Sequence, residues 1–252
     1  MMLLSFIAAM AAAESQCTQI GRADIVAVPA PAVIVLGERH GTQPDLARAE
    51  RIVRLLAMEN EVTLALESVG DVHQGTLDDF ADGKLSLDAL PQALEWDQSS
   101  AFPWTAYQSL VTGALYDVDV IAAGPPTDAP PNTKRFPVPS GYASLYVDAM
   151  GNDEVEKGIE ERFVRAMAWR ENRIAHFSTQ SWDRKGYLVI VTDRAGVEGG
   201  LGVTWQLRQM LQGVPVHGYT LHWGSNPPCY SGDKLWRQPW WDKLFESWGW
   251  KE

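Results

Sequence analysis

Short apolar runs alternate along the chain with longer stretches in which apolar residues recur every three or four positions. The runs have the length and β-branched content of buried strands, and the stretches between them have the period of amphipathic helices. The expected strands are Ala32–Leu36, Val62–Leu66, Val118–Ala123, Tyr187–Thr192 and Val214–Leu221, and the expected helices are Pro44–Met58, Pro103–Tyr116, Asp153–Gln180 and Val203–Leu211. This alternation predicts a single-domain α/β fold, with a mostly parallel sheet flanked by helices on both faces.

Charged and imidazole side chains stand where the first two strands are expected to end. The first run stops at Gly37 and is followed by Glu38 and His40, and the second run ends in Glu67. In an open α/β sheet the carboxyl ends of parallel strands share one edge, where ligands bind. Because an unpaired charge at such a position costs desolvation energy, we expect these side chains to form a site.

Two further residues fall on the same predicted edge. Asp193 follows the fourth strand and His222 follows the fifth. Two imidazoles and three carboxylates together suit a divalent metal such as zinc or manganese. The expected metal ligands are Glu38, His40, Glu67, Asp193 and His222. For Asp193 and His222 a structural role stays open, because strand-end caps and surface imidazoles are common.

The net charge of the chain disfavours some classes of binding partner. The sequence has 252 residues, a formal net charge of −11 and 46% hydrophobic residues. This length and hydrophobic fraction suit one globular domain with a complete core. The negative charge argues against nucleic acid and anionic membrane surfaces as non-specific partners.

Several motifs that identify enzyme classes are absent from the sequence. It has no His-Glu-x-x-His, no Gly-x-Ser-x-Gly, no Gly-x-x-x-x-Gly-Lys and no Gly-x-Gly-x-x-Gly that opens a helix. These absences disfavour serine hydrolase, nucleotide hydrolase and dehydrogenase chemistry. The absence of Cys-x-x-Cys-His excludes covalent attachment of a c-type haem.

Residues 1–13 form an apolar run that ends in three alanines. This pattern is typical of a secretory signal peptide and is too short for a membrane span. No basic residue precedes the run, and the residues before Cys17 form no clear lipoprotein cleavage site. We expect residues 14–252 to be the mature domain, exported to the periplasm. The alternative is an apolar N-terminal segment that packs on the core.

The two ends of the mature chain carry further signals. Its two cysteines, Cys17 and Cys229, could pair in an oxidising compartment and join the chain ends. The C-terminal tail, residues 235–252, is rich in tryptophan, and a helix is expected in it after Pro239. The apolar stripe of this helix either docks on the core or offers a surface to a partner or a flat apolar ligand.

Four groups of residues, taken in order, resemble the ChaN-like haem-binding proteins of the Tiki and erythromycin-esterase superfamily. They are Val33–His40 with its Gly-Glu-x-His end, Leu64–Glu67, Trp96 with Phe102–Tyr107 and Val118–Gly124, and Arg165–Ala168 with Tyr187–Leu207. The likeness spans residues from about 30 to about 210 and rests on the order and spacing of the segments.

The resemblance implies haem binding at the bacterial envelope, in connection with iron uptake. In this interpretation His40 and Tyr107 are the candidate axial donors, and Trp104 is one of the aromatic residues that would line a flat slot. Other branches of the superfamily are metal-dependent proteases or esterases. In that alternative Glu38 and His40 hold the ion, and Glu67 is a ligand or the general base for a metal-bound water.

One position departs from the family pattern. Family members usually carry a histidine in the turn after the fourth strand, and here the corresponding residue is Gly196. The missing imidazole counts against the hydrolase, although Asp193 or His222 could substitute for it. Haem or another small ligand is therefore the expected partner. A homodimer and a protein partner for the tryptophan-rich tail stay open.

Overall fold

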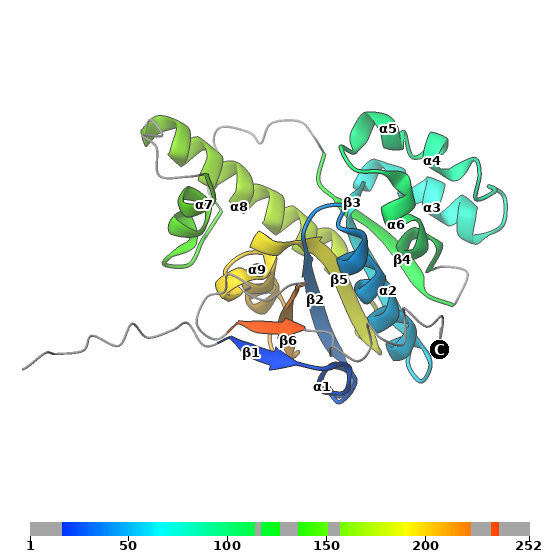
Figure 1. The fold of residues 1–252 in the computed structure, drawn as a ribbon, viewed down its shortest axis with the longest axis horizontal. Helices are drawn as coiled ribbons and strands as arrows, with labels where there is room; N and C mark the ends of the chain where they lie inside the picture. Colours follow the sequence, from blue (N-terminus) through cyan, green and yellow to red (C-terminus); the bar gives the residue numbers. More distant parts are fainter. Residues whose placement is uncertain (1–16, 114–116, 127–135, 151–156, 223–232, 237–252) are drawn as a thin grey trace, which may run out of the picture.

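The chain folds around a parallel β-sheet (Figure 1). The computed structural model describes residues 17–113, 117–126, 136–150, 157–222 and 233–236. Within these ranges the sheet has seven strands in the order β1-β7-β6-β2-β5-β3-β4, and all paired strands are parallel. The strands are β1 (Thr18–Ile20), β2 (Ala32–Glu38), β3 (Val62–Gly70), β4 (Asp119–Gly124), β5 (Tyr187–Asp193), β6 (Val216–Leu221) and β7 (Lys234–Trp236). Their carboxyl ends therefore share one edge.

Strand β2 lies at the centre of the sheet because it is apolar on both faces. All of its residues are buried, and it pairs with β5 on one side and β6 on the other. Its side chains alternate, so that Ile34 and Leu36 join one core and Val33 and Val35 join the other. A strand of this kind requires helices on both faces of the sheet.

One face is covered by helices from the first half of the chain. These are α1 (Arg22–Val26), α2 (Gln43–Ala57), α3 (Gln74–Ala81), α4 (Leu90–Ala93), α5 (Trp96–Ser99) and α6 (Trp104–Val111), with the 3-10 turn η1 (Asp71–His73) before α3. Helix α2 buries Leu46, Ile52 and Leu56 in the core that contains Ile34 and Leu36. The short helices α3 to α5 form an insertion between β3 and α6 (Figure 1).

The opposite face is covered by α8 (Lys157–Gln180) and α9 (Val203–Met210). Ile174 and Leu207 from these helices pack in one core with Val33 and Ile190. The 3-10 turns η3 (Arg194–Gly196) and η4 (Glu198–Gly200) connect β5 to α9. Helix α7 (Tyr142–Met150) lies against α8 and away from the sheet, in a separate small apolar cluster (Figure 1).

The predicted fold class is confirmed. The differences lie at the ends of elements, at the sheet edge and in helices α1 and α7, which have no counterpart among the predicted helices. Strands β2 and β3 continue through Glu38 and Gly70, so Glu67 lies inside β3 and not at its end. Strands β1 and β7 have no counterpart among the predicted strands, because three residues are too few to show a period.

The described chain ends meet in the sheet. Strand β1 pairs with β7, and Cys17, directly before β1, is disulfide-bonded. Its expected partner Cys229 lies outside the described residues, as do residues 1–13 and the expected helix after Pro239. Of the tryptophan-rich tail, Leu235 and Trp236 belong to β7. Within the described ranges, no helix has the length and apolar character that a membrane crossing requires.

Gly186 precedes β5 at a point where the backbone leaves no room for a side chain. Its φ is +54°, and a Cβ there would lie 1.9 Å from the Glu61 carbonyl oxygen. We expect Gly186→Ala to lower the free energy of unfolding by more than about 3 kcal/mol, because a backbone clash adds to the cost of a left-handed alanine. Urea unfolding followed by tryptophan fluorescence measures this loss.

Gly83→Ala is the matched control for this prediction. Gly83 also has a positive φ, +73°, but a Cβ there meets nothing within 4 Å. Its replacement should cost about 1 kcal/mol, the cost of the left-handed conformation alone. Equal losses in the two variants would contradict the close approach of Gly186 to Glu61.

Candidate functional site

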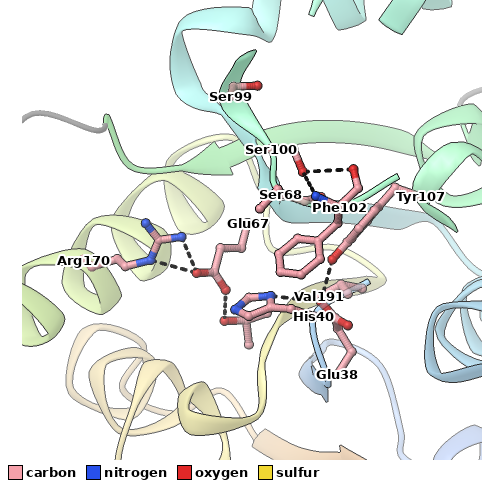
Figure 2. A pocket seen from close by; sticks show the side chains of 12 residues that line it. Glu38, His40, Glu67, Ser68, Ser99, Ser100, Phe102, Tyr107, Arg170 and Val191 are labelled. Atoms are coloured by element: carbon pink, nitrogen blue, oxygen red, sulfur yellow. Dashed lines mark hydrogen bonds and ion pairs between the residues drawn. The ribbon is translucent and has the colours of Figure 1, made fainter. Parts of the chain in front are cut away.

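A cavity of about 280 Å³ opens at the carboxyl edge of the sheet (Figure 2). Glu38 and Glu67 reach it from β2 and β3, His40 from the turn after β2, and Arg170 from α8. Phe102, in the segment between α5 and α6, lies across the opening. The structure thus brings together the three residues that the first two strand ends predicted.

The carboxylate of Glu67 is buried and fully engaged. Its Oε1 accepts hydrogen bonds from Nε and Nη2 of Arg170, at 2.9 and 2.6 Å. Its Oε2 accepts from the Thr192 hydroxyl at 2.5 Å and from the Asp193 backbone N–H at 2.9 Å. These four donors offset the cost of burying the charge. Glu67 is therefore held as an anchor between β3, β5 and α8, which does not favour it as a general base.

Glu38 is the second buried carboxylate of the site and is 3% exposed. Its Oε1 accepts a hydrogen bond from the Tyr107 hydroxyl at 2.8 Å, and Nδ1 of His40 lies 3.3 Å from the same oxygen. The Tyr107 oxygen in turn accepts from the Gly41 N–H at 3.0 Å. Burial and the Glu38 charge raise the pKa of Tyr107, so its phenol stays protonated. Tyr107 lines the cavity but is 1% exposed, and its hydroxyl is engaged by Glu38 and Gly41.

His40 bridges two carboxylates at the mouth of the cavity. Its Nδ1 faces Glu38, its Nε2 lies 3.6 Å from Oδ2 of Asp193, and its ring stacks on Phe102 at a centroid distance of 5.1 Å. Asp193, followed by Glu38, raises the pKa of His40 to about 10, against the lowering effect of burial. The side chain is 43% exposed. At neutral pH it is an imidazolium that is accessible from solvent.

The turn after β5 explains the departure from the family pattern. Asp193 accepts a hydrogen bond from the Gly196 N–H at 2.8 Å, which closes the turn. A Cβ at Gly196 would lie 2.8 Å from Thr192, the residue whose hydroxyl donates to Glu67. A histidine at this position would therefore displace a contact of the Glu67 anchor.

His222 lies apart from the other predicted ligands. It is 6% exposed, is not among the residues that line the cavity, and finds no hydrogen-bond partner for either ring nitrogen within the part of the chain that the structure describes. Burial, followed by the charges of Arg39 and Arg194, lowers its pKa. Among the residues that the structure describes, no three His, Cys, Asp or Glu side chains are placed to hold a metal ion. The five predicted ligands therefore do not form one metal site here, because Glu67 is paired with Arg170 and His222 lies apart from the cavity.

Arg170 was not predicted as a site residue, and Trp104, which was predicted to line the ligand slot, lies outside the cavity lining. Arg170 stands three residues after Met167 and four before Ile174, on the apolar stripe of α8, and a charge on that stripe was the available signal. Trp104 packs edge-on against Trp96, with centroids 5.2 Å apart, and does not line the cavity.

Arg170→Met tests the role of the Glu67 anchor. Removal of the guanidinium leaves a buried carboxylate without its cation, so we expect a loss of about 2–3 kcal/mol in the free energy of unfolding. Arg173→Met, one turn further along α8, is the control. Arg173 lies 3.9 Å from Asp71, and its loss should cost under about 1 kcal/mol. Equal losses by chemical denaturation would contradict the anchor.

The bridge at His40 predicts a pH-dependent stability. Because the folded-state pKa of about 10 lies above the ordinary 6.5, the stabilisation is complete below pH 6.5 and is lost as pH rises through 10. We expect wild type to exceed His40→Ala by about 1–2 kcal/mol near pH 6, after allowance for screening at a half-exposed site, and by little near pH 10.5. Denaturant unfolding measures this gap, with His176→Ala as the control. A gap that does not change with pH would refute the bridge.

Comparison with known proteins places the chain in a family. A family model described as haem-binding uptake, Tiki superfamily, ChaN matches residues 27–207, well over half of the chain. The fold is similar to that of Campylobacter jejuni ChaN, which binds heme cofacially, with a TM-score of 0.62 and 16% identity over 77% of this chain and 83% of that one. No curated protein matches the sequence.

Two further solved structures are less similar to this chain. The type III effector HopBA1 has a TM-score of 0.42 and 12% identity, over 82% of this chain and 88% of that one. A plasmid partition protein from Borrelia burgdorferi has a TM-score of 0.31 and 11% identity, over 88% and 86%. The family match across most of the sheet and its helices, including β2, β3 and β5 at the cavity, shows that this chain belongs to the ChaN haem-binding uptake family of the Tiki superfamily.

Proposed function

We propose that this chain binds haem at the mouth of the cavity, with His40 as the iron donor, and that it serves in haem or iron uptake. The observation that carries the proposal is the accessible imidazole of His40, whose other nitrogen faces a buried carboxylate. Imidazoles that ligate metals commonly use their second nitrogen in this way. Family membership and the heme-binding relative support the proposal.

The two predicted axial donors differ in how well they fit haem. His40 fits better, because its side chain is 43% exposed and Glu38 and Phe102 orient its ring; Nε2, which lies 3.6 Å from Asp193 Oδ2, would exchange that contact for iron. Tyr107 does not fit, because it is 1% exposed and its hydroxyl already donates to Glu38. Bound haem would supply a ferric or ferrous iron that accepts the imidazole nitrogen. The cavity is smaller than pockets that enclose drug-sized ligands, so the proposal concerns the exposed mouth.

The carboxylates around His40 affect its binding of an iron cation in two opposing ways. The proton on the imidazole must leave before the nitrogen can bind iron, and the raised pKa opposes that step at neutral pH. The same negative charges that retain the proton also attract an iron cation at the same nitrogen. Affinity for ferric haem through His40 should therefore increase with pH.

Export to the periplasm is part of the proposal. It rests on the apolar run of residues 1–13 and is supported by the disulfide at Cys17, because disulfides persist in oxidising compartments. The metal-dependent hydrolase stays a prediction. It needs Glu67 as ligand or base, and that carboxylate already receives four hydrogen bonds.

Haemin titration tests the proposal. We expect wild type to give a saturable Soret band, and His40→Ala to shift the band and weaken binding by about tenfold or more, because the variant lacks the donor nitrogen. Tyr107→Phe is the control within the same wall and should leave the band position unchanged. Wild-type affinity should rise between pH 6 and pH 9. An unchanged band in His40→Ala, or a shifted band in Tyr107→Phe alone, would exclude His40 as the donor.

A further inference from the structure

A second buried carboxyl group lies outside the cavity, between α7 and α8. Glu171 of α8 is 2% exposed, and each of its oxygens accepts a hydrogen bond from a tyrosine of α7. The Tyr142 hydroxyl donates to Oε2 at 2.5 Å, and the Tyr146 hydroxyl donates to Oε1. Within the described residues, these are the hydrogen bonds that the carboxyl receives. One acidic group of α8 thus connects both tyrosines of α7 to the body of the protein.

The surroundings of Glu171 disfavour a negative charge. The backbone of Gly202 closes one side, because a Cβ there would lie 2.6 Å from Oε1. The charged groups that face the cluster from neighbouring strands are Asp193 of β5 and Glu67 of β3, both negative. Arg170 is the adjacent residue on α8, but its guanidinium is turned to Glu67. Burial, followed by these two acidic groups, raises the pKa of Glu171 to about 8, although the tyrosine hydroxyls lower it.

The attachment of α7 depends on this cluster. Tyr142, Leu145 and Tyr146 are buried in an apolar cluster separate from the two cores of the sheet. The cluster includes Ala168 of α8, and Ala195 and Leu201 from the connection between β5 and α9 pack against it. Tyr146 also packs edge-on against Phe163, with centroids 5.8 Å apart. In Figure 1, α7 lies beside α8. Its docking therefore rests on one small apolar patch and one shared carboxyl.

We propose that α7 is a proton-controlled latch, docked on α8 while Glu171 is protonated and loosened when that proton is released to solvent. A protonated carboxyl group and two phenols can hydrogen-bond to one another without a net charge. Among the described residues, a carboxylate in the same place would be a buried anion with no cation as partner, and separation of α7 from α8 would let water reach it. This inference does not depend on haem binding.

The direction of the pH dependence follows from proton linkage. An exposed glutamate has a pKa of 4.5, whereas docked Glu171 has a pKa of about 8. Between these values the docked state binds one more proton than the undocked state, so docking weakens as pH rises and the effect levels off above pH 8. The limiting slope is about a tenfold change in the docking equilibrium per pH unit. The latch is tight in acid and loose in mild alkali.

Hydrogen–deuterium exchange of the full chain tests the latch. Exchange of the α7 amides, corrected for the intrinsic pH dependence of the chemistry, should increase by at least about tenfold between pH 5 and pH 8.5 in wild type. Glu171→Gln cannot ionise and should give a flat profile, whereas Glu161→Gln, at an exposed position of the same helix, should behave as wild type. A flat wild-type profile, or the same slope in Glu171→Gln, would overturn the proposal.

A second variant keeps the test decisive if Glu171→Gln does not fold. Tyr146→Phe removes one hydroxyl that stabilises the carboxylate form, so the pKa of Glu171 should rise further. The pH at which α7 exchange levels off should therefore move upward by at least half a unit. A plateau at the wild-type pH, or one at lower pH, would show that the carboxyl does not control α7.

Discussion

The burial of one carboxylate, that of Glu67, sets the arrangement of the whole cavity. A charge removed from water must be matched by donors, and here four donors come from α8, from a threonine side chain and from the backbone of β5. The match requires Arg170 to reach across the sheet edge from α8 and the end of β5 to stay beside β3. The position of α8 over the sheet is thus coupled to the wall of the cavity.

Three buried acidic groups near this edge avoid an unpaired charge in three different ways. Glu67 is paired with a guanidinium, Glu38 lies beside a phenol and an imidazolium, and Glu171 has its protonated form favoured by burial while it accepts hydrogen bonds from two phenols. The first of these pairings does not respond to pH below the strongly alkaline range, because arginine keeps its proton there. The Glu171 carboxyl has a pKa of about 8 and the His40 imidazolium a pKa of about 10, so the two groups lose their protons at different alkaline pH values. The same edge of the sheet therefore combines a fixed anchor with two groups that respond to protons.

The chain keeps the ChaN framework while one element of the common pattern is replaced. The turn after β5 holds Gly196 where relatives are expected to carry a histidine, and the local backbone packs against Thr192 too closely for a side chain. The donor that remains accessible is His40, supported by Glu38 and Phe102. In the proposed haem site His40 is an accessible imidazole, whereas metal-assisted hydrolysis needs several free ligands and a base.

Local pattern was sufficient to predict the layers of the fold. The central strands are apolar on both faces and the helices between them are amphipathic, so the parallel sheet and its two helical layers follow from periods of about 2 and about 3.6 residues along the chain. The same pattern could not reveal β1 and β7, which are three residues long and gain their order from pairing with each other and with β6. Their pairing depends on contacts between residues far apart in the sequence.

The amino-acid sequence by itself determined that Glu38, His40 and Glu67 would share one edge, because every strand of a parallel sheet ends on the same side. Only the tertiary structure decided what those side chains do. It brought Arg170 to Glu67 from about a hundred residues away and turned Tyr107 into a buried donor. It also left His222 outside the group. Partners of this kind are fixed by helix packing and side-chain direction, and neither is encoded in the spacing of residues along a single strand.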